Sequence, residues 1–292
     1  MRRLPTVFLI LGITLFECHP QVIADEDGLE DVLKPPPFEQ FLVIPLRIHI
    51  LSATDLPEID CHLGDADVHR ILGKANRIWN VAGIHWGLES IVREPAARQE
   101  CFREKLKEDT PPDLFSYRML LPEMSRNHDG LHVYYLHKFA VNGVWLGGDF
   151  ALVQETAKLK AVEGGIDEPI PRVTSHELGH ALGLPHRQNR TNLLASGTTG
   201  TKLNSTEVKT ARETAKGKHG AKTVADLKIE ARKTEDQTKA SRIWNWLGEI
   251  PGVDDEPGLQ LKRIKGAVES APEQPSISAQ NLKAAPRASR DQ

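Results

Sequence analysis

Three histidines and a glutamate at fixed spacing are the residues of this sequence best suited to chemistry. They lie in the segment HELGHALGLPH, which begins at His176 and ends at His186. Four residues of an α-helix turn about 400°, so His176 and His180 lie one turn apart on one face and can bind one small cation. Glu177 lies about 100° around the helix from His176, too far to be a ligand but close enough to reach a metal-bound water.

The residues after His180 predict that the chain turns back toward the same ion. Gly183 can end the helix in a left-handed conformation without steric cost, and Pro185 prevents its continuation. His186 can then supply a third nitrogen. Three neutral nitrogen ligands with an open fourth position are typical of a catalytic zinc, not of a closed structural one. The alternative is an amphipathic helix with surface histidines, and the further match at Gly183 and His186 counts against it.

The pattern HExxHxxGxxH resembles the zinc signature of the metzincin clan of metallopeptidases. The resemblance implies that His176, His180 and His186 bind one catalytic Zn²⁺ and that Glu177 is the general base for a zinc-activated water. It therefore implies a secreted zinc-dependent endopeptidase acting on a protein or peptide substrate. One alternative is a catalytically silent secreted binding protein that retains the fold and the zinc. Another is a structural zinc in an interaction protein, which the lack of a fourth protein ligand near His186 disfavours.

One feature of the metzincin pattern is missing from this sequence. Members of the clan have a methionine in a tight turn beneath the zinc, but no methionine follows His186. Residues 192–197 (NLLASG) resemble that turn, with Leu194 at the methionine position. Leucine for methionine nearly conserves volume and typically costs under about 1.5 kcal/mol, so we expect the zinc site to survive. Ser196 stands where two families of the clan have an additional tyrosine ligand, so no such ligand is expected.

Hydrophobic periodicity predicts an α+β domain around this segment. A core-packed helix is expected at 65–82. Strands are expected at 41–51, 84–92, 131–138, 143–146 and 150–154. This order resembles the metzincin catalytic domain, which implies a twisted, mostly parallel sheet with an antiparallel edge strand, an active-site helix and a small C-terminal subdomain. The resemblance also implies that the edge, residues 142–148, binds peptide as an added strand, although no individual substrate-binding residue is identified.

Two cysteines lie in the predicted domain. Cys61 precedes the first helix, and Cys101 lies in residues 93–130, an expected insertion with helical pieces between the second and third strands. In an oxidising compartment an isolated pair is expected to form a disulfide, which would stabilise the fold by roughly 4 kcal/mol in the chain-entropy model. The alternative is two separate buried thiols.

The N-terminal residues 1–24 resemble a secretory signal peptide. Arg2 and Arg3 precede a short apolar run, and Ala24 is a small residue suited to cleavage. This predicts a secreted, periplasmic or extracellular protein with no membrane span after signal removal. Acidic and proline-rich residues 25–40 are expected to form a leader or short propeptide. The 37 Lys and Arg residues nearly balance 40 Asp and Glu residues, so the charge gives no indication of nucleic-acid binding.

The catalytic domain is expected to span 41–220, followed by a helical C-terminal extension at 221–250 and a disordered tail at 251–292. Asn204 and Glu207 have the spacing of a capping box and predict a helix start. A second helical stretch is expected at 224–247, where Trp244 and Trp246 either dock on the catalytic domain or form a partner surface. Nothing in the sequence indicates the oligomeric state.

The histidines outside the signature are interpreted as structural. His49, His132 and His137 lie in predicted strands and are expected to be packed or half-exposed. His62 and His69 would be separated by two helical turns even if both were helical, which is too far for one ion on one helix. No second metal site is therefore predicted there.

Overall fold

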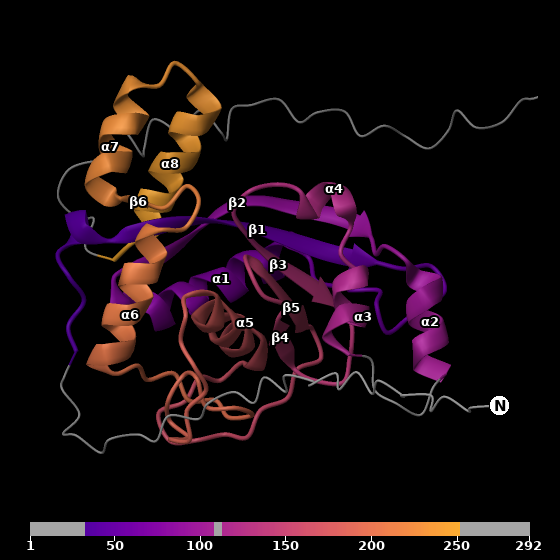
Figure 1. Ribbon diagram of the computed structural model, residues 1–292. Helices are drawn as coiled ribbons and strands as arrows, with labels where there is room; N and C mark the ends of the chain where they lie inside the picture. Colours follow the sequence, from indigo (N-terminus) through magenta and orange to yellow (C-terminus); the bar gives the residue numbers. More distant parts are fainter. Residues whose placement is uncertain (1–32, 108–112, 252–292) are drawn as a thin grey trace, which may run out of the picture. The chain divides into compact units, whose positions relative to one another are not determined.

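The computed structural model describes residues 33–107 and 113–251 (Figure 1). The expectations for the signal peptide 1–24, for most of the leader 25–40 and for nearly all of the tail 251–292 concern residues outside these ranges. Within the described ranges, no helix combines the length and apolar character needed to cross a bilayer. Residues 38–40 form a short 3-10 turn that leads into the first strand.

A six-stranded, mostly parallel sheet forms the centre of the fold, with its strands in the order β2-β1-β3-β5-β4. The strands are β1 (Leu42–Ser52), β2 (Ile84–Pro95), β3 (Leu131–Leu136), β4 (Gly143–Trp145) and β5 (Phe150–Gln154). β4 runs antiparallel to β5 and forms one edge, while the short β6 (Lys222–Thr223) pairs antiparallel with the start of β1. The prediction of an α+β fold with a mostly parallel sheet and an antiparallel edge strand is confirmed.

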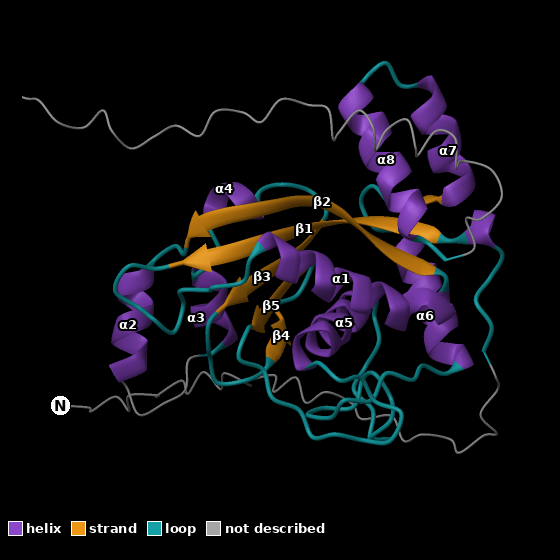
Figure 2. Ribbon diagram, turned by 180° about the vertical axis from the view of Figure 1, so that it is seen from behind, coloured by secondary structure: helices purple, strands orange, loops and turns teal. Residues whose placement is uncertain are grey.

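One face of the sheet is covered by α1 (Asp65–Trp79) and α5 (Pro169–Ala181), which lie side by side (Figures 1 and 2). Six apolar residues of α1 recur at helical spacing and are buried: Val68, Ile71, Leu72, Ala75, Ile78 and Trp79. Burying each of the Val, Leu and Ile side chains contributes about 1.5–3 kcal/mol. Trp79 also packs edge-on against Trp86 of β2, with ring centroids 5.7 Å apart. This core is the support on which α5 rests.

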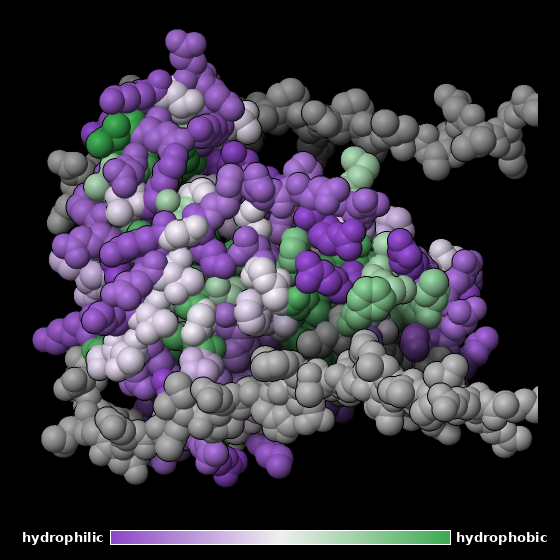
Figure 3. Space-filling model, viewed as in Figure 1, coloured by the Kyte–Doolittle hydropathy of each residue, from purple (hydrophilic) through white to green (hydrophobic). Residues whose placement is uncertain are grey.

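The insertion between β2 and β3 covers part of the opposite face. It forms α2 (Gln99–Lys107), α3 (Leu114–Met119) and α4 (Glu123–Arg126). Phe102 and Tyr117 join a second buried apolar cluster with side chains of β3 and β5. Phe115 and Met124 remain exposed, and Figure 3 shows apolar surface in this region, near α3 and α4.

The predicted disulfide between Cys61 and Cys101 is wrong, because both residues are free thiols. Cys61 is buried before α1, where its thiol lies 3.4 Å from a carboxylate oxygen of Glu155. Cys101 is exposed on α2. On that helix the adjacent Phe102 faces the core, and neighbouring helical residues point about 100° apart, so Cys101 faces solvent.

The C-terminal part of the described chain is helical. α6 (Ser205–Lys216) begins with the predicted capping box, in which Asn204 and Glu207 each accept a hydrogen bond from the other's backbone N–H. The single helical stretch expected at 224–247 is instead two helices, α7 (Val224–Lys233) and α8 (Gln237–Glu249). They separate because Thr234 is extended and Asp236 caps the start of α8 through the N–H of Lys239.

Trp246 of α8 docks on the sheet, as the first of the two alternatives predicts. Trp244 and Trp246 are both buried. The Trp246 indole donates to the carbonyl of Leu88 in β2 at 2.8 Å. Its ring covers Gly87, where an added Cβ would come within 2.7 Å of it. The α7–α8 pair lies across the sheet from α1 and α5 (Figure 2).

Candidate metal centre

The helix α5 carries the first two histidines of the signature. It begins at Pro169, and a proline there is favourable because the first helical N–H groups have no partner in the helix. The helix ends at Ala181, and Gly183 has φ +83, the left-handed conformation expected for this residue. The chain therefore reverses after α5 and brings His186 back to the face that carries His176 and His180.

The three histidines converge through their Nε2 atoms. The Nε2 of His180 lies 3.1 Å from that of His176 and 3.2 Å from that of His186. All three nitrogens lie within 4.8 Å of one another, as required of a metal-binding group. A tetrahedral zinc with bonds of about 2.0–2.1 Å has nitrogens roughly 3.3 Å apart. The histidines predicted to bind one metal ion are thus brought together at suitable separations.

Hydrogen bonds fix which nitrogen of each helical histidine carries a proton. His176 Nδ1 and His180 Nδ1 each lie 2.8 Å from a backbone carbonyl, of Leu193 and Leu184 respectively. A carbonyl only accepts, so each Nδ1 carries the proton and each neutral ring has a bare Nε2. Arg172 Nη1, itself a donor, lies farther from His176 Nδ1 than the Leu193 carbonyl does, at 3.3 Å. Two bare nitrogens 3.1 Å apart cannot satisfy each other, whereas a cation between them satisfies both. The residues present therefore fit a divalent metal ion.

The surroundings of the histidines keep them neutral. Burial, followed by the charge of Arg172, lowers the pKa of His176 well below its usual value. Burial also lowers the pKa of His180 to about 4 and lowers the pKa of His186. Neutral imidazole is the form that binds metal, so at neutral pH no proton competes for these nitrogens.

Glu177 lies beside the histidines with its carboxyl group out of contact with solvent. It is 4% exposed, and burial raises the pKa of the carboxyl to about 8, against the smaller opposing effects of the Trp145 backbone and Arg172. The side chain packs against the edge strand, because a Cβ added at Gly143 would lie 2.8 Å from Glu177 Oε1. A carboxyl with this pKa can both take and give a proton near neutral pH.

The turn that carries Leu194 lies directly beneath α5. Leu194 is fully buried and packs on Gly179, where an added Cβ would come within 3.2 Å of Leu194 Cδ1. The preceding carbonyl, of Leu193, is the one that accepts from His176. The turn therefore supports the helix and at the same time fixes the tautomer of one histidine.

Arg172 is a buried residue of this site that the sequence analysis missed. It is 1% exposed, and burial lowers the pKa of its guanidinium to about 10. It donates to the backbone carbonyls of Gly200 at 3.1 Å, Asn192 at 3.3 Å and Ala195. Arg172 precedes His176 by one helical turn, so its place on the metal-facing side of the helix was readable from its spacing.

A second polar group holds the other side of the same turn. Asn192 accepts from the N–H of Leu194 at 2.6 Å and donates to Glu207 at 2.9 Å. Glu207 also accepts from Arg187 Nε at 2.7 Å, and it is 1% exposed. Glu207, which was predicted only as part of a helix cap, thus also connects α6 to the turn beneath the histidines.

Two other buried histidines, His49 and His132, form a separate network. His132 Nε2 lies 2.9 Å from the carbonyl of His128, so it donates, and His132 Nδ1 must accept from His49 Nε2 at 2.9 Å. His49 Nδ1 is then left as an acceptor 2.7 Å from Glu94. Burial lowers the pKa of His49 to about 3 and raises the pKa of Glu94, and both shifts favour a proton on Glu94 over one on His49. The prediction that His49 and His132 are packed is confirmed.

No protein-family model and no curated protein matches this chain. Among solved structures, it is similar to a chain of one described as the structure of a chaperone-substrate complex, with 10% sequence identity and a TM-score of 0.36. The match covers 61% of this chain and 38% of the other. The chain thus spans well under half the length of that protein, and a likeness of this degree carries no argument about fold or function.

Proposed function

We propose that this chain is a secreted zinc-dependent endopeptidase of the metzincin clan. The observation that carries the proposal is the convergence of three histidine Nε2 atoms beside a buried glutamate. The mostly parallel sheet with its antiparallel edge strand, the position of α5 and the turn at Leu194 support the proposal. Secretion rests on the resemblance of residues 1–24 to a signal peptide.

His176, His180 and His186 would hold the zinc. A zinc ion bound by three histidines supplies Lewis acidity, which lowers the pKa of a water molecule and polarises a carbonyl group. His176 and His180 contribute bare Nε2 atoms because Leu193 and Leu184 fix their Nδ1 protons. The turn beneath α5 therefore holds two of the three ligands in the required tautomer.

Glu177 is the general base and then the general acid of the proposed hydrolysis. Its carboxylate takes a proton from the attacking water and passes it to the nitrogen of the leaving amine. Burial raises its pKa to about 8, and a dication at the histidines would lower it again, because a nearby positive charge favours the carboxylate. The Glu177 side chain also packs against Gly143 of the edge strand.

The edge strand β4 is the proposed binding surface for the substrate backbone. It pairs with β5 on one side and ends the strand order of the sheet, so its other side can accept an extended peptide. Main-chain pairing of this kind does not depend on the sequence of the peptide. The Asn142 side chain fixes the start of the strand by bonding the backbone N–H and carbonyl of Lys158.

The second candidate function is a secreted binding protein that retains the fold and the zinc but does not turn over substrate. The leucine at position 194, where the clan has methionine, is the observation that favours it. The intact Glu177 opposes it, since a binding protein has no use for a buried base next to the metal ligands.

Zinc content and cleavage of an unfolded protein, measured together, test the proposal. We expect Glu177→Gln to keep the zinc content of the unmutated chain and to lose cleavage. His180→Ala combined with His186→Ala should lose one zinc per chain together with cleavage. Equal cleavage by the unmutated chain and Glu177→Gln would refute the peptidase mechanism. Zinc at the histidines without cleavage by any variant would favour the binding protein.

A further inference from the structure

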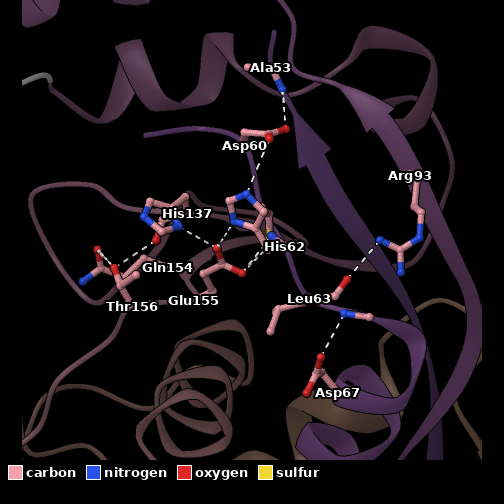
Figure 4. Close-up of polar contacts among 12 residues, drawn as sticks. Ala53, Asp60, His62, Leu63, Asp67, Arg93, His137, Gln154, Glu155 and Thr156 are labelled. Carbon is pink, nitrogen blue, oxygen red and sulfur yellow. Dashed lines mark hydrogen bonds and ion pairs between the residues drawn. The ribbon is translucent and has the colours of Figure 1, made fainter. Parts of the chain in front are cut away.

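A second group of metal-ligand side chains lies at the carboxyl ends of three adjacent parallel strands (Figure 4). Glu155 directly follows β5, His137 directly follows β3, and His62 lies in the loop between β1 and α1. Strands β1, β3 and β5 are neighbours in the sheet. The residues that follow them therefore meet at one edge, which is where open α/β sheets place their ligand sites.

The two imidazoles point at one carboxylate oxygen. Glu155 Oε1 lies 2.6 Å from His137 Nδ1 and 3.0 Å from His62 Nδ1. The three ligand atoms all lie within 4.8 Å of one another. The two rings are nearly perpendicular, with centroids 5.4 Å apart. Figure 4 shows both rings directed at the Glu155 side chain.

The carboxylate is held in its charged form. Burial alone would raise the pKa of Glu155, but hydrogen bonds from His137 and His62 outweigh burial and bring the pKa below its usual value. Its second oxygen accepts the backbone N–H of His62 at 2.9 Å and the Cys61 thiol at 3.4 Å. One oxygen is thus anchored by the loop before α1, while the other accepts from both imidazoles, whose Nδ1 protons an ion would replace.

Backbone hydrogen bonds keep the three segments in place independently of any ion. His137 N–H donates to the carbonyl of Ile59, and Thr156 N–H donates to the carbonyl of His137, both at 3.3 Å. Glu155 N–H donates to the carbonyl of Leu136 at 2.9 Å. The ligands are therefore preorganised, which lowers the cost of ordering them around an ion.

A carboxylate behind His62 completes the arrangement. Asp60 Oδ2 lies 3.7 Å from His62 Nε2, on the side of the ring away from Glu155, and Asp60 Oδ1 accepts the backbone N–H of Ala53 at 3.0 Å. Metal-binding histidines commonly present their second nitrogen to a carboxylate in this way. His62 is mostly exposed and His137 about one-third exposed, so an ion can reach the cluster from solvent.

We propose that His62, His137 and Glu155 form a second metal site, which binds one divalent ion of the zinc type. Two imidazole nitrogens and one carboxylate oxygen are ligands that zinc accepts, with water completing the coordination. The ion joins the loop after β1 to the ends of β3 and β5. Its role is structural, because it fixes the start of the segment 155–168 that leads into α5. This site shares no residue with the histidines of α5 and does not depend on the proposed peptidase function.

The experiment is zinc content per chain for a set of variants of the purified chain, measured by mass spectrometry after excess zinc is removed. We expect two zinc ions for the unmutated chain and one for His62→Ala. We also expect one for the double variant His180→Ala/His186→Ala and none when all three substitutions are combined. The control His69→Ala removes an exposed histidine outside both clusters and should keep two.

The same counts separate this proposal from the proposed function. The second site is supported if His180→Ala/His186→Ala binds one zinc ion and adding His62→Ala abolishes that binding, whatever the activity of the protein. No zinc in the double variant overturns it and leaves the cluster as a set of hydrogen bonds around Glu155. Because His62 is exposed, its replacement should leave the circular dichroism unchanged.

Cobalt gives a second measurement on the His180→Ala/His186→Ala chain. Bound Co²⁺ should show visible d–d absorption that His62→Ala and His137→Ala each abolish, and zinc should raise the Tm only where both histidines are present. Absorption and Tm that are the same with and without His62 would overturn the proposal.

Discussion

Replacing Arg172 with methionine removes the buried cation beneath the metal centre while keeping much of the side chain's length and apolar stem. The backbone carbonyls of Ala195 and Gly200 lose the hydrogen bond from Arg172, whereas the carbonyl of Asn192 keeps the one from the N–H of Ala195. A buried unsatisfied acceptor costs about 1–3 kcal/mol. Removing a charge that was costly to bury offsets part of this loss of stability. We expect the free energy of unfolding to fall by about 3–5 kcal/mol, at the upper end of single-substitution effects.

Urea unfolding of the metal-free chain, followed by circular dichroism, measures this loss without the stabilisation that a bound ion adds. Arg212→Met is the matched control. Arg212 also donates to three backbone carbonyls, of Gln40, Ala82 and Gly83, but it is half-exposed, so water can replace it. We expect Arg212→Met to lower the free energy of unfolding by about 1 kcal/mol. A loss for Arg172→Met no larger than that of the control would refute the reasoning.

Three further substitutions test the site and its surroundings. Leu194→Met should change the free energy of unfolding by less than about 1.5 kcal/mol and leave zinc content unchanged; loss of zinc would contradict the position of this turn. Gly143→Ala places a Cβ 2.8 Å from Glu177 Oε1, so cleavage should fall about 100-fold with zinc retained, and unchanged cleavage would count against the role of Glu177. Glu94→Gln keeps a donor toward His49. Because the pKa of Glu94 is raised in the folded chain, the unmutated protein should lose stability as pH rises above the usual value of 4.5. In urea unfolding across pH, Glu94→Gln should lack this decline, and identical pH profiles would argue against a proton on Glu94.

The part of the metal centre that could be predicted is the part encoded within one helix and the turn after it. The spacing of His176, His180 and His186 requires only helix geometry and one left-handed glycine, and both are present. The sheet was predictable for a similar reason, because each buried strand has its own run of apolar residues. The position of Arg172 on the helix was also readable, but its three carbonyl partners were not, since they come from a loop whose return path no local pattern specifies.

The failed predictions involve residues whose environment depends on tertiary packing. The disulfide was expected from the count of cysteines, but the orientation of Cys101 on α2 follows from which face of that helix the core takes. The division of 224–247 into α7 and α8 depends on Asp236 capping a new helix where a continuous pattern of Lys, Ala and Glu favoured one. Composition alone cannot decide between one long helix and a capped pair when both bury Trp246.

The cluster of His62, His137 and Glu155 was not predicted because the sequence analysis placed the end of the third strand too late. The prediction extended the third strand to residue 138, which placed His137 inside the sheet, whereas β3 ends at Leu136 and His137 is the first residue beyond it. Glu155 holds the same position after β5, so these two residues become neighbours once β3 and β5 are known to be adjacent and parallel. Polar residues immediately after two parallel strands are therefore candidates for a shared ligand site even when their separation in sequence fits no motif. His62 enters the site only because the loop after β1 folds over the same edge.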